Sequence, residues 1–243
     1  MVCRHDAADW GHSVSKADPL RLLIVGYGRM GRLVEVLAAE QGMQVAGRVT
    51  SSNANRDDDW PAADVAIDFS SPSAVLANAE RLAARGMDLV IGTTGWLDGE
   101  QAVREALSRY PVGIVAAPNF ALGVNIFVAI ATRAAELMAG RPEYGAWIHE
   151  LHHRAKKDAP SGTAIGIRDA MQRAGYAAEI DVASTRAGSI PGTHTIGFDS
   201  AADTITLTHT ARDRSVFARG ALEAARWVHG RRGWFSMKDV LGL

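Results

Sequence analysis

The sequence predicts an α/β protein, with a Rossmann-like, doubly wound parallel sheet at the N-terminal side and a C-terminal α+β domain built on an open mixed sheet. Three observations predict this fold. Apolar strand runs alternate with helical periods in the first half of the chain, a glycine-rich turn joins the first strand to the first helix, and the later part consists mainly of strands. We therefore divide the 243 residues into a flexible arm at 1–18, a dinucleotide-binding domain at 19–120 plus 212–243, and a substrate-binding and oligomerisation domain at 121–211.

The first domain is expected to contain five strands, each a nearly continuous apolar run of the kind found in parallel sheets covered on both faces. These strands are predicted at Leu20–Val25, Met43–Val49, Val65–Phe69, Asp88–Ile91 and Val112–Ala116. The intervening helices are predicted at Met30–Gln41, Ser73–Arg85 and Asp98–Tyr110. The segment Thr50–Asp64 is polar and acidic, so we expect a loop or a single turn there instead of a crossover helix.

After Asn119 the pattern changes to that of an α+β domain. Strands are predicted at Tyr144–Glu150, Glu179–Arg186, Gly192–Phe198 and Thr204–Thr210, and helices at Leu122–Met138 and Thr163–Ala174. A last helix, Ser215–His229, is expected to pack back on the first domain. Because an open sheet leaves one face to be covered, we also expect self-association.

Composition excludes several classes of function. The net charge is −1 at pH 7, which argues against nucleic acid or an anionic membrane as the main partner. No stretch approaches the roughly 20 apolar residues of a transmembrane helix. Cys3 is the only cysteine, so no internal disulfide can form, and a reducing, cytoplasmic location is expected.

The glycine-rich turn, Gly26-Tyr27-Gly28-Arg29-Met30-Gly31, indicates a dinucleotide site. In a strand–turn–helix context, the first glycine permits the tight turn and the second lets a pyrophosphate approach the backbone. The third lets the helix pack against the strand. The free N–H groups at the start of the helix would then bind the pyrophosphate.

The choice between NADPH and NADH stays open. The acid that usually holds the adenosine ribose at the end of the second strand is missing, and Thr50 and Ser51 stand there instead. Small hydroxyl residues would not repel a 2′-phosphate, and Arg48 or Arg56 could attract it, which favours acceptance of NADPH. The acidic run 57–59 could reverse this preference if its loop folds inward.

The segment 149–164 is dense in polar groups, with three histidines, three cations and two acids before a Pro-Ser-Gly-Thr turn. It has no apolar period, so we expect it to lie outside the core. Three interpretations compete. His149, His152 and His153 could bind zinc, although their spacing matches no standard zinc site; the segment could be a solvated loop; or it could be catalytic, and we predict no metal.

The catalytic interpretation accounts for most of these residues. A histidine titrates near neutrality and can donate a proton, and Lys156 supplies a fixed charge and a second donor. Ser161, Gly162 and Thr163 begin a helix whose N–H groups and hydroxyls suit a carboxylate. Asp158 could order the loop or cap this helix. Two turns that follow strands, 92–95 and 117–120, would surround the nicotinamide at the same sheet edge.

With these residues the sequence resembles the 4-hydroxy-tetrahydrodipicolinate reductases, or dihydrodipicolinate reductases, of bacterial lysine and diaminopimelate synthesis. The resemblance runs from about Leu20 to Leu243, and its most specific part is Glu150–Ala164. Further matching motifs are Gly-Arg-Met-Gly (28–31), Asp-Phe-Ser (68–70), Gly-Thr-Thr-Gly (92–95), Asn-Phe (119–120), Arg-Ala-Gly (186–188) and His-Thr (194–195). Two departures from the family pattern are a glycine loop one residue shorter and Thr50 at a usually acidic position.

The resemblance implies a homotetramer, and it implies a role for each candidate residue. His152 would be the proton donor, and Lys156 a second one. The dicarboxylate substrate would be held by His153, Thr94, Ser161, Gly162 and Thr163. The cofactor, NADPH or NADH, would contact Gly26, Tyr27, Gly28, Arg29, Met30, Gly31, Thr50, Ser51, Phe69, Gly92, Thr93, Thr94, Ala117, Pro118, Asn119 and Phe120.

The implied reaction agrees with these residue types. The substrate would lose water to give a conjugated imine, take a hydride at a ring carbon, and then need a general acid to protonate the resulting enamine. Two other interpretations stay open: a related dehydrogenase such as an aspartate dehydrogenase, which would not need this histidine–lysine loop, and a non-catalytic dinucleotide sensor. The roles of Arg186 and Arg214 are not predicted, since both could equally be surface or interface arginines.

Overall fold

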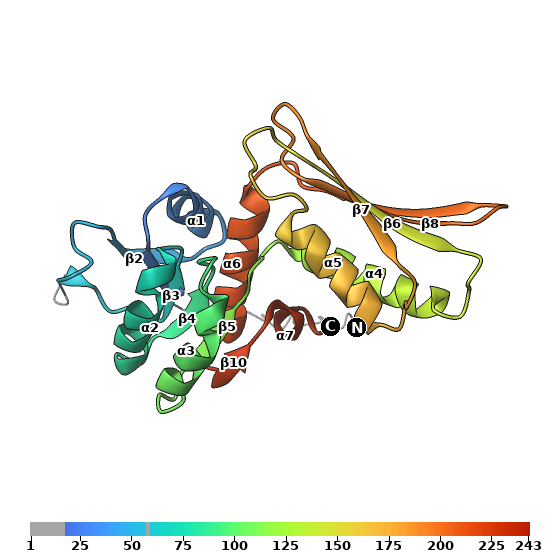
Figure 1. Ribbon diagram of the computed structural model, residues 1–243. Coiled ribbons are helices and arrows are strands. Elements are labelled where there is room, and N and C mark those ends of the chain that lie inside the picture. Colours follow the sequence, from blue (N-terminus) through green and yellow to red (C-terminus); the bar gives the residue numbers. More distant parts are fainter. Residues whose placement is uncertain (1–17, 57–58) are drawn as a thin grey trace, which may run out of the picture.

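Two sheets organise the residues that the computed structural model describes, 18–56 and 59–243 (Figure 1). The larger sheet has six strands, all parallel, in the order β10-β5-β4-β3-β1-β2. Its strands are β1 (Arg21–Val25), β2 (Gln44–Val49), β3 (Val65–Asp68), β4 (Asp88–Ile91), β5 (Gly113–Ala116) and β10 (Gly233–Phe235). The chain moves outward from β1 to β2 and then builds β3, β4 and β5 on the other side, which confirms the predicted doubly wound sheet.

Helices cover both faces of this sheet because its central strands are apolar on both sides. In β1, Leu22 and Ile24 belong to one core and Leu23 and Val25 to the other, and all four are at most 1% exposed. Each such side chain contributes roughly 1.5–3 kcal/mol on burial. The first core is closed by α1 (Arg29–Glu40) and α6 (Ser215–Val228), and the second by α2 (Val75–Ala84) and α3 (Glu100–Leu107).

Between β2 and β3 the described residues contain no α-helix, as the polar composition of this segment predicted. Trp60 covers the sheet in its place: it is 4% exposed, packs in the second core and donates its indole N–H to the backbone oxygen of Asn53 at 3.1 Å. The guanidinium of Arg81 stacks over the Trp60 ring at 4.7 Å. One aromatic side chain therefore replaces the apolar stripe of a crossover helix.

Two C-terminal elements were not predicted, because each is too short to show a period. β10 adds a sixth strand by pairing with β5, and α7 (Met237–Leu241) follows it. The helices predicted from Ser73 and Asp98 are also divided, each starting with a 3₁₀ turn. These turns are η2 (Pro72–Ala74) and η3 (Leu97–Gly99).

The second sheet has four strands in the order β7-β6-β8-β9, with β6 and β7 parallel and the other pairs antiparallel. Its strands are β6 (Gly145–His152), β7 (Ile180–Arg186), β8 (Thr193–Asp199) and β9 (Thr204–Thr210). Figure 1 shows α4 (Leu122–Met138) and α5 (Gly162–Arg173) on one side of it. In the described part of the chain no helix covers the opposite face, where Trp147, His149 and Leu151 are half-buried.

Strand β6 corrects one sequence prediction. The polar segment from His149 onward was expected outside the core, but β6 continues to His152, and its residues alternate between the two faces of the sheet. Glu150 is 0% exposed and His152 is 9% exposed, both on the side of the helices. The prediction was wrong because a period-2 pattern can place polar side chains inward when they satisfy one another there.

Candidate active site

Two adjoining cavities open at the carboxyl edge of the parallel sheet, where ligands bind in folds of this kind. The first has a volume of about 480 Å³ and is lined by the glycine loop and the ends of β3, β4 and β5. The second, of about 1310 Å³, reaches from there to β6 and α5. Residues common to both are Met30, Thr94, Pro118, Asn119, Arg214 and Phe217. A ligand in the first cavity would therefore face a ligand in the second.

The glycine loop has the geometry that a dinucleotide requires. Gly26 has φ +87°, and a Cβ on it would lie 2.4 Å from the backbone oxygen of Phe69. A Cβ on Gly31 would lie 2.3 Å from the backbone oxygen of Gly26, because α1 packs directly on the turn. Gly28, by contrast, is the N-cap residue of α1. It has open space around its Cβ position and no side chain to bond the first N–H groups of the helix. A pyrophosphate therefore fits over Gly28, where free N–H groups meet the positive end of the helix dipole.

The ends of β3 and β4 are held together by Asp68, which is 3% exposed. Its carboxylate accepts bonds from Ser70 and from the hydroxyl of Thr93 at 2.6–2.8 Å, and from the amide of Asn78 at 3.0 Å. Phe69 lies between these anchored neighbours and meets Phe120 edge to face, with centroids 6.4 Å apart. The turns expected to surround the nicotinamide are thus tied to one another at the sheet edge.

Some predicted cofactor residues do not line either cavity: Gly26, Tyr27, Gly31, Thr50, Ser51 and Ala117. Thr50 directly follows β2, and its backbone N–H donates to Asn53 Oδ1 at 2.7 Å. Arg48, considered as a phosphate ligand, forms an ion pair with Glu35, which also accepts the hydroxyl of Tyr27. Asp57 and Asp58, which were considered to oppose NADPH, lie outside the described residues.

The predicted catalytic and substrate residues all line the second cavity, and Thr94 among them also lines the first. The others lie in the second cavity alone. They are His152, His153, Lys156, Ser161, Gly162 and Thr163. Ser161 caps α5, since its hydroxyl accepts the N–H of Ala164 at 3.2 Å. Lys156 Nζ donates to both oxygens of Asp158, at 2.7 and 2.8 Å, and this bond lowers the pKa of the Asp158 carboxyl. Asp158 therefore orders the loop by holding Lys156, and its carboxyl also accepts a backbone bond from Gly162 at the start of α5, whose cap is the side chain of Ser161.

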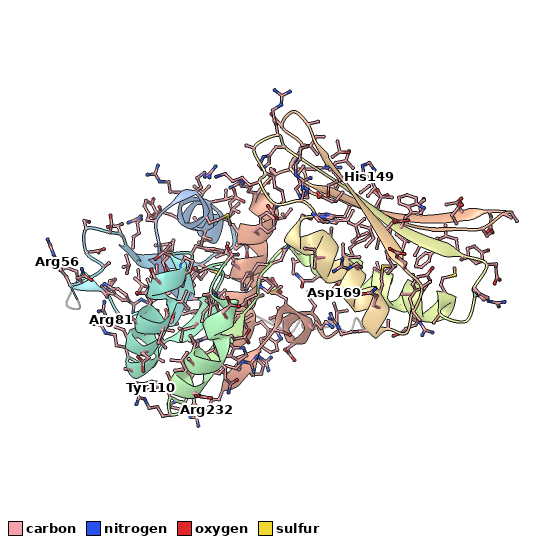
Figure 2. All side chains as sticks on the ribbon, viewed as in Figure 1. Arg56, Arg81, Tyr110, His149, Asp169 and Arg232 are labelled. Carbon is pink, nitrogen blue, oxygen red and sulfur yellow. The ribbon has the colours of Figure 1, made fainter. Side chains whose placement is uncertain are left out.

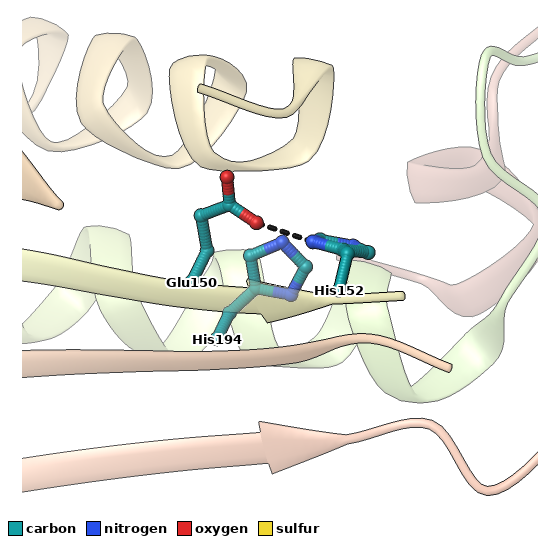
Figure 3. A group of neighbouring side chains, drawn as sticks. All are labelled: Glu150, His152 and His194. Atoms are coloured by element: carbon teal, nitrogen blue, oxygen red, sulfur yellow. Dashed lines mark hydrogen bonds and ion pairs between the residues drawn. The ribbon is translucent and has the colours of Figure 1, made fainter. Parts of the chain in front are cut away.

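A buried ionic network underlies this cavity, and the sequence interpretation missed it. Arg186 donates to both oxygens of Glu150, at 2.6 and 3.0 Å, and the backbone N–H of Ser161 donates to one of them at 3.2 Å. His152 Nδ1 bonds to Glu150 Oε2 (Figure 3). Burial by itself would raise the pKa of Glu150, but the bonds from Arg186, Ser184 and His152 prevail and lower it to about 2. Glu150 is therefore an anion at neutral pH.

Two histidines meet beside this anion. The rings of His152 and His194 are 5.2 Å apart and nearly perpendicular, and His194 Nε2 lies 3.2 Å from the hydroxyl of Ser161. Burial, followed by the charge of His152, lowers the pKa of His194 to about 4. Burial also lowers the pKa of His152, while its bond to Glu150 opposes this shift. At neutral pH, His194 is an uncharged neighbour of the predicted proton donor.

The geometry does not support the zinc interpretation. His149, labelled in Figure 2, points to the other face of β6 and bonds to the hydroxyl of Thr185 at 2.9 Å. A different set, Glu150, His152 and His194, brings ligand atoms within 4.8 Å of one another. Both oxygens of Glu150 are already engaged by Arg186, whose positive charge would repel a cation placed between the three side chains.

The sequence contained a signal for part of this network. Glu150 and His152 are two residues apart, so on a strand they share a face. The partners Arg186 and His194 come from β7 and β8. Both stand in motifs that match the family, but no local pattern indicates that they pair with Glu150 and His152. Arg214, also left open, lines both cavities, since it stands where the chain crosses back to α6.

Comparison with known proteins gives one consistent result. Residues 20–120 match the family model for the N-terminus of dihydrodipicolinate reductase, and residues 123–241 match the model for its C-terminus. The 4-hydroxy-tetrahydrodipicolinate reductase of Stenotrophomonas maltophilia is 43% identical over 92% of this chain and 98% of its own. That of Christiangramia forsetii is 36% identical over 91% of this chain and 98% of its own.

A solved structure agrees on the fold. Dipicolinate-bound dihydrodipicolinate reductase from Paenisporosarcina sp. TG-14 matches with a TM-score of 0.74 at 21% identity, covering 90% of this chain and 97% of that one. The described residues include no helix long and apolar enough to cross a membrane. From both family models and these relatives, the chain belongs to the dihydrodipicolinate reductase family, as its motifs predicted.

Proposed function

We propose that the chain catalyses the NAD(P)H-dependent reduction of 4-hydroxy-tetrahydrodipicolinate to tetrahydrodipicolinate, with loss of water, in diaminopimelate and lysine synthesis. The main structural support for this proposal is the arrangement of the two cavities. The cavity that adjoins the glycine loop is walled on its far side by His152, Lys156 and the N-terminus of α5. Hydride donor, anion site and proton donors would then face one another across one space.

The N-terminus of α5 is suited to a substrate carboxylate. The first turn of the 12-residue helix α5, with Gly162 and Thr163, lines the second cavity, and the helix dipole adds positive potential there. His153 and Lys156 line the same cavity and can bond a second carboxylate by charge-assisted hydrogen bonds. The related Paenisporosarcina enzyme is described as dipicolinate-bound, which is also a ring with two carboxylates.

His152 is proposed as the general acid. A reduced nicotinamide bound along the glycine loop would supply the hydride to the conjugated imine left by loss of water. The enamine that results carries its extra electron density on a ring carbon, and the imidazolium of His152 would transfer a proton there. Lys156, freed from Asp158 when substrate enters, would balance the negative charge and serve as a second donor.

We further propose a homotetramer in the cytoplasm. The open face of the second sheet leaves Trp147, His149 and Leu151 half-buried in the single chain, and a second copy would cover them. The reduced cofactor and the single cysteine fit a reducing compartment. NADPH and NADH are both expected to serve, because Thr50 and Ser51 carry no charge.

The test is to follow cofactor oxidation by absorbance, with substrate generated freshly from pyruvate and aspartate semialdehyde. We expect rapid oxidation of NADPH or NADH that depends on the substrate, and the ratio of the two rates gives the cofactor preference. Binding of the cofactor without any oxidation would overturn the reductase assignment and favour a dinucleotide sensor. Sedimentation analysis at the assay concentration tests the tetramer independently.

A further inference from the structure

Beneath the proposed proton donor lies a buried carboxylate that takes no direct part in the reaction. We propose that Glu150, clamped by Arg186, is a positioning residue that fixes the tautomer of His152, with Nδ1 facing the carboxylate and Nε2 delivering the proton. This inference rests on the proposed function, in which His152 is the general acid.

The hydrogen bonds that Glu150 accepts hold its side chain in the ionised carboxylate form. It is 0% exposed, and its two oxygens accept three bonds from Arg186 and the backbone of Ser161. A carboxylate buried this deeply persists as an anion only when such donors surround it. An ionised carboxylate is purely an acceptor, so the His152 nitrogen that faces it must carry a hydrogen. The neutral form of His152 is therefore protonated on Nδ1.

The other ring nitrogen is left accessible. His152 lines the second cavity, and a Cβ on Gly192 would lie 3.0 Å from His152 Nε2. Gly192 has φ +152°, a conformation that glycine adopts without strain, so the backbone passes over the ring with no side chain on it. Any larger residue at this position would press on the nitrogen that delivers the proton.

Arg186 connects the two proposed proton donors. Besides the two bonds to Glu150, its guanidinium donates to the backbone oxygen of Asp158 at 2.6 Å. Asp158 in turn holds Lys156. The strand β7 therefore supplies one cation that contacts both the partner of the histidine and the lysine loop, which an arginine can do because its guanidinium carries several donors in a fixed plane.

His194 packs beside His152 without adding a positive charge at neutral pH. The hydroxyl of Ser161 accepts the N–H of Ala164 and lies 3.2 Å from His194 Nε2, so it ties the ring of His194 to the start of α5. Because His194 is uncharged at neutral pH, His152 is the ring that takes up a proton next to Glu150. The charged or titratable groups around His152 are thus Glu150 from β6, Arg186 from β7, His194 from β8 and Lys156 from the loop.

The direction of the expected pH effect follows from these contacts. A general acid works only when protonated, so kcat should fall as the pH rises through the pKa of His152. Burial lowers that pKa, and Glu150 opposes the shift through its hydrogen bond and its charge. Removing the negative charge of Glu150 should lower the pKa of His152 further. The alkaline limb of the kcat profile should then move to lower pH.

The experiment compares Glu150→Gln with the double variant Glu150→Gln/Arg186→Met and with His152→Gln. The double variant removes both buried charges, so it tests the positioning role without leaving an unpaired arginine. Asp88→Asn serves as the matched control, because Asp88 is another buried carboxylate, 8% exposed, that bonds the backbone of Gly113 and Gly230 away from the site. For each variant, the kcat and KM profiles are recorded against pH, and ¹⁵N NMR of labelled histidine identifies the tautomers.

We expect the His152 resonances, assigned by their loss in His152→Gln, to show the Nδ1–H form in the unmodified enzyme. In both Glu150 variants this preference should be lost, kcat should fall by about 10²-fold and the alkaline limb should move to lower pH. In Glu150→Gln, which keeps Arg186 on the lysine loop, the substrate KM should stay nearly unchanged. Asp88→Asn should alter none of these. An Nε2–H tautomer in the unmodified enzyme, or a Glu150→Gln profile equal to the original, would overturn the inference. Full turnover by His152→Gln would instead overturn the proposed function.

Discussion

The two walls of the proposed active site are built on different principles. On the cofactor side, the wall is formed mainly by backbone. Gly26 and Gly31 allow the strand, turn and helix to pack in direct contact, and Gly28 leaves the N-terminus of the helix uncovered by a side chain. On the substrate side, buried side chains from three strands neutralise one another, with Glu150 at the centre. The first wall depends on short-range geometry, and the second on charges brought together by the fold.

This difference predicts different consequences of mutation. Changes on the cofactor side should act through steric strain and affect binding. Changes on the substrate side should act through charge and affect the chemical step and its pH dependence. The following predictions test that contrast, from the largest expected effect to the smallest.

Lys156→Ala should have the largest effect. It removes the flexible cation of the substrate wall, so we expect kcat/KM for the dicarboxylate to fall by about 10²–10⁴-fold while cofactor binding is retained. Steady-state kinetics and fluorescence titration with NADPH measure the two quantities. Lys238→Ala, on α7 outside both cavities, is the control. Undiminished turnover of Lys156→Ala would remove this residue from the catalytic site.

Gly26→Ala should damage the cofactor wall instead. The added Cβ meets backbone at 2.4 Å in addition to the strain of φ +87°. Gly42→Ala is a matched control, since Gly42 has φ +71° but open space around its Cβ position. The control should lose about 1–2 kcal/mol of stability from the left-handed conformation alone. Gly26→Ala should lose more and should also bind NADPH weakly in the titration; equal losses would show that the contact with Phe69 is unimportant.

A gradual effect of pH on stability should reveal the buried network. The pKa of His194 is lowered to about 4 from 6.5. Between pH 4 and 6.5 this side chain is therefore protonated in the unfolded chain and unprotonated in the folded one. Stability should therefore fall as the pH drops from 6.5 towards 4, by at most about 1.4 kcal/mol for each pH unit. The pKa of Glu150, lowered to about 2 from 4.5, extends the loss to more acidic pH.

Denaturant unfolding at a series of pH values measures this slope. In His194→Gln the slope between pH 6.5 and 4 should become shallower, while the loss below pH 4.5 should remain. An unchanged slope in this variant would mean that other groups cause the acid sensitivity. In Glu150→Gln/Arg186→Met the loss of stability below pH 4.5 should become smaller, while a slope between pH 6.5 and 4 should remain.

Much of the fold could be predicted because its signals are local. The glycine spacing and the apolar runs identify the doubly wound sheet, and the predicted bounds of Asp88–Ile91, Leu122–Met138 and Thr204–Thr210 agree with the structure. The absence of a crossover helix was also predictable from polar composition. That Trp60 takes the helix's place was not, because a single aromatic residue has no periodicity.

The candidate site divides in the same way. By itself the sequence determined the family, the glycine loop and the group of candidate proton donors, since each lies in a contiguous motif with a spacing that its chemistry requires. Only the tertiary structure decided that Glu150 and His152 are inside, that Arg186 pairs with the buried carboxylate, and that His194 is a neutral neighbour. The physical reason is that a buried charge is stable only beside its partners, and these partners stand on β6, β7 and β8, which are neighbours in the sheet but not in the sequence.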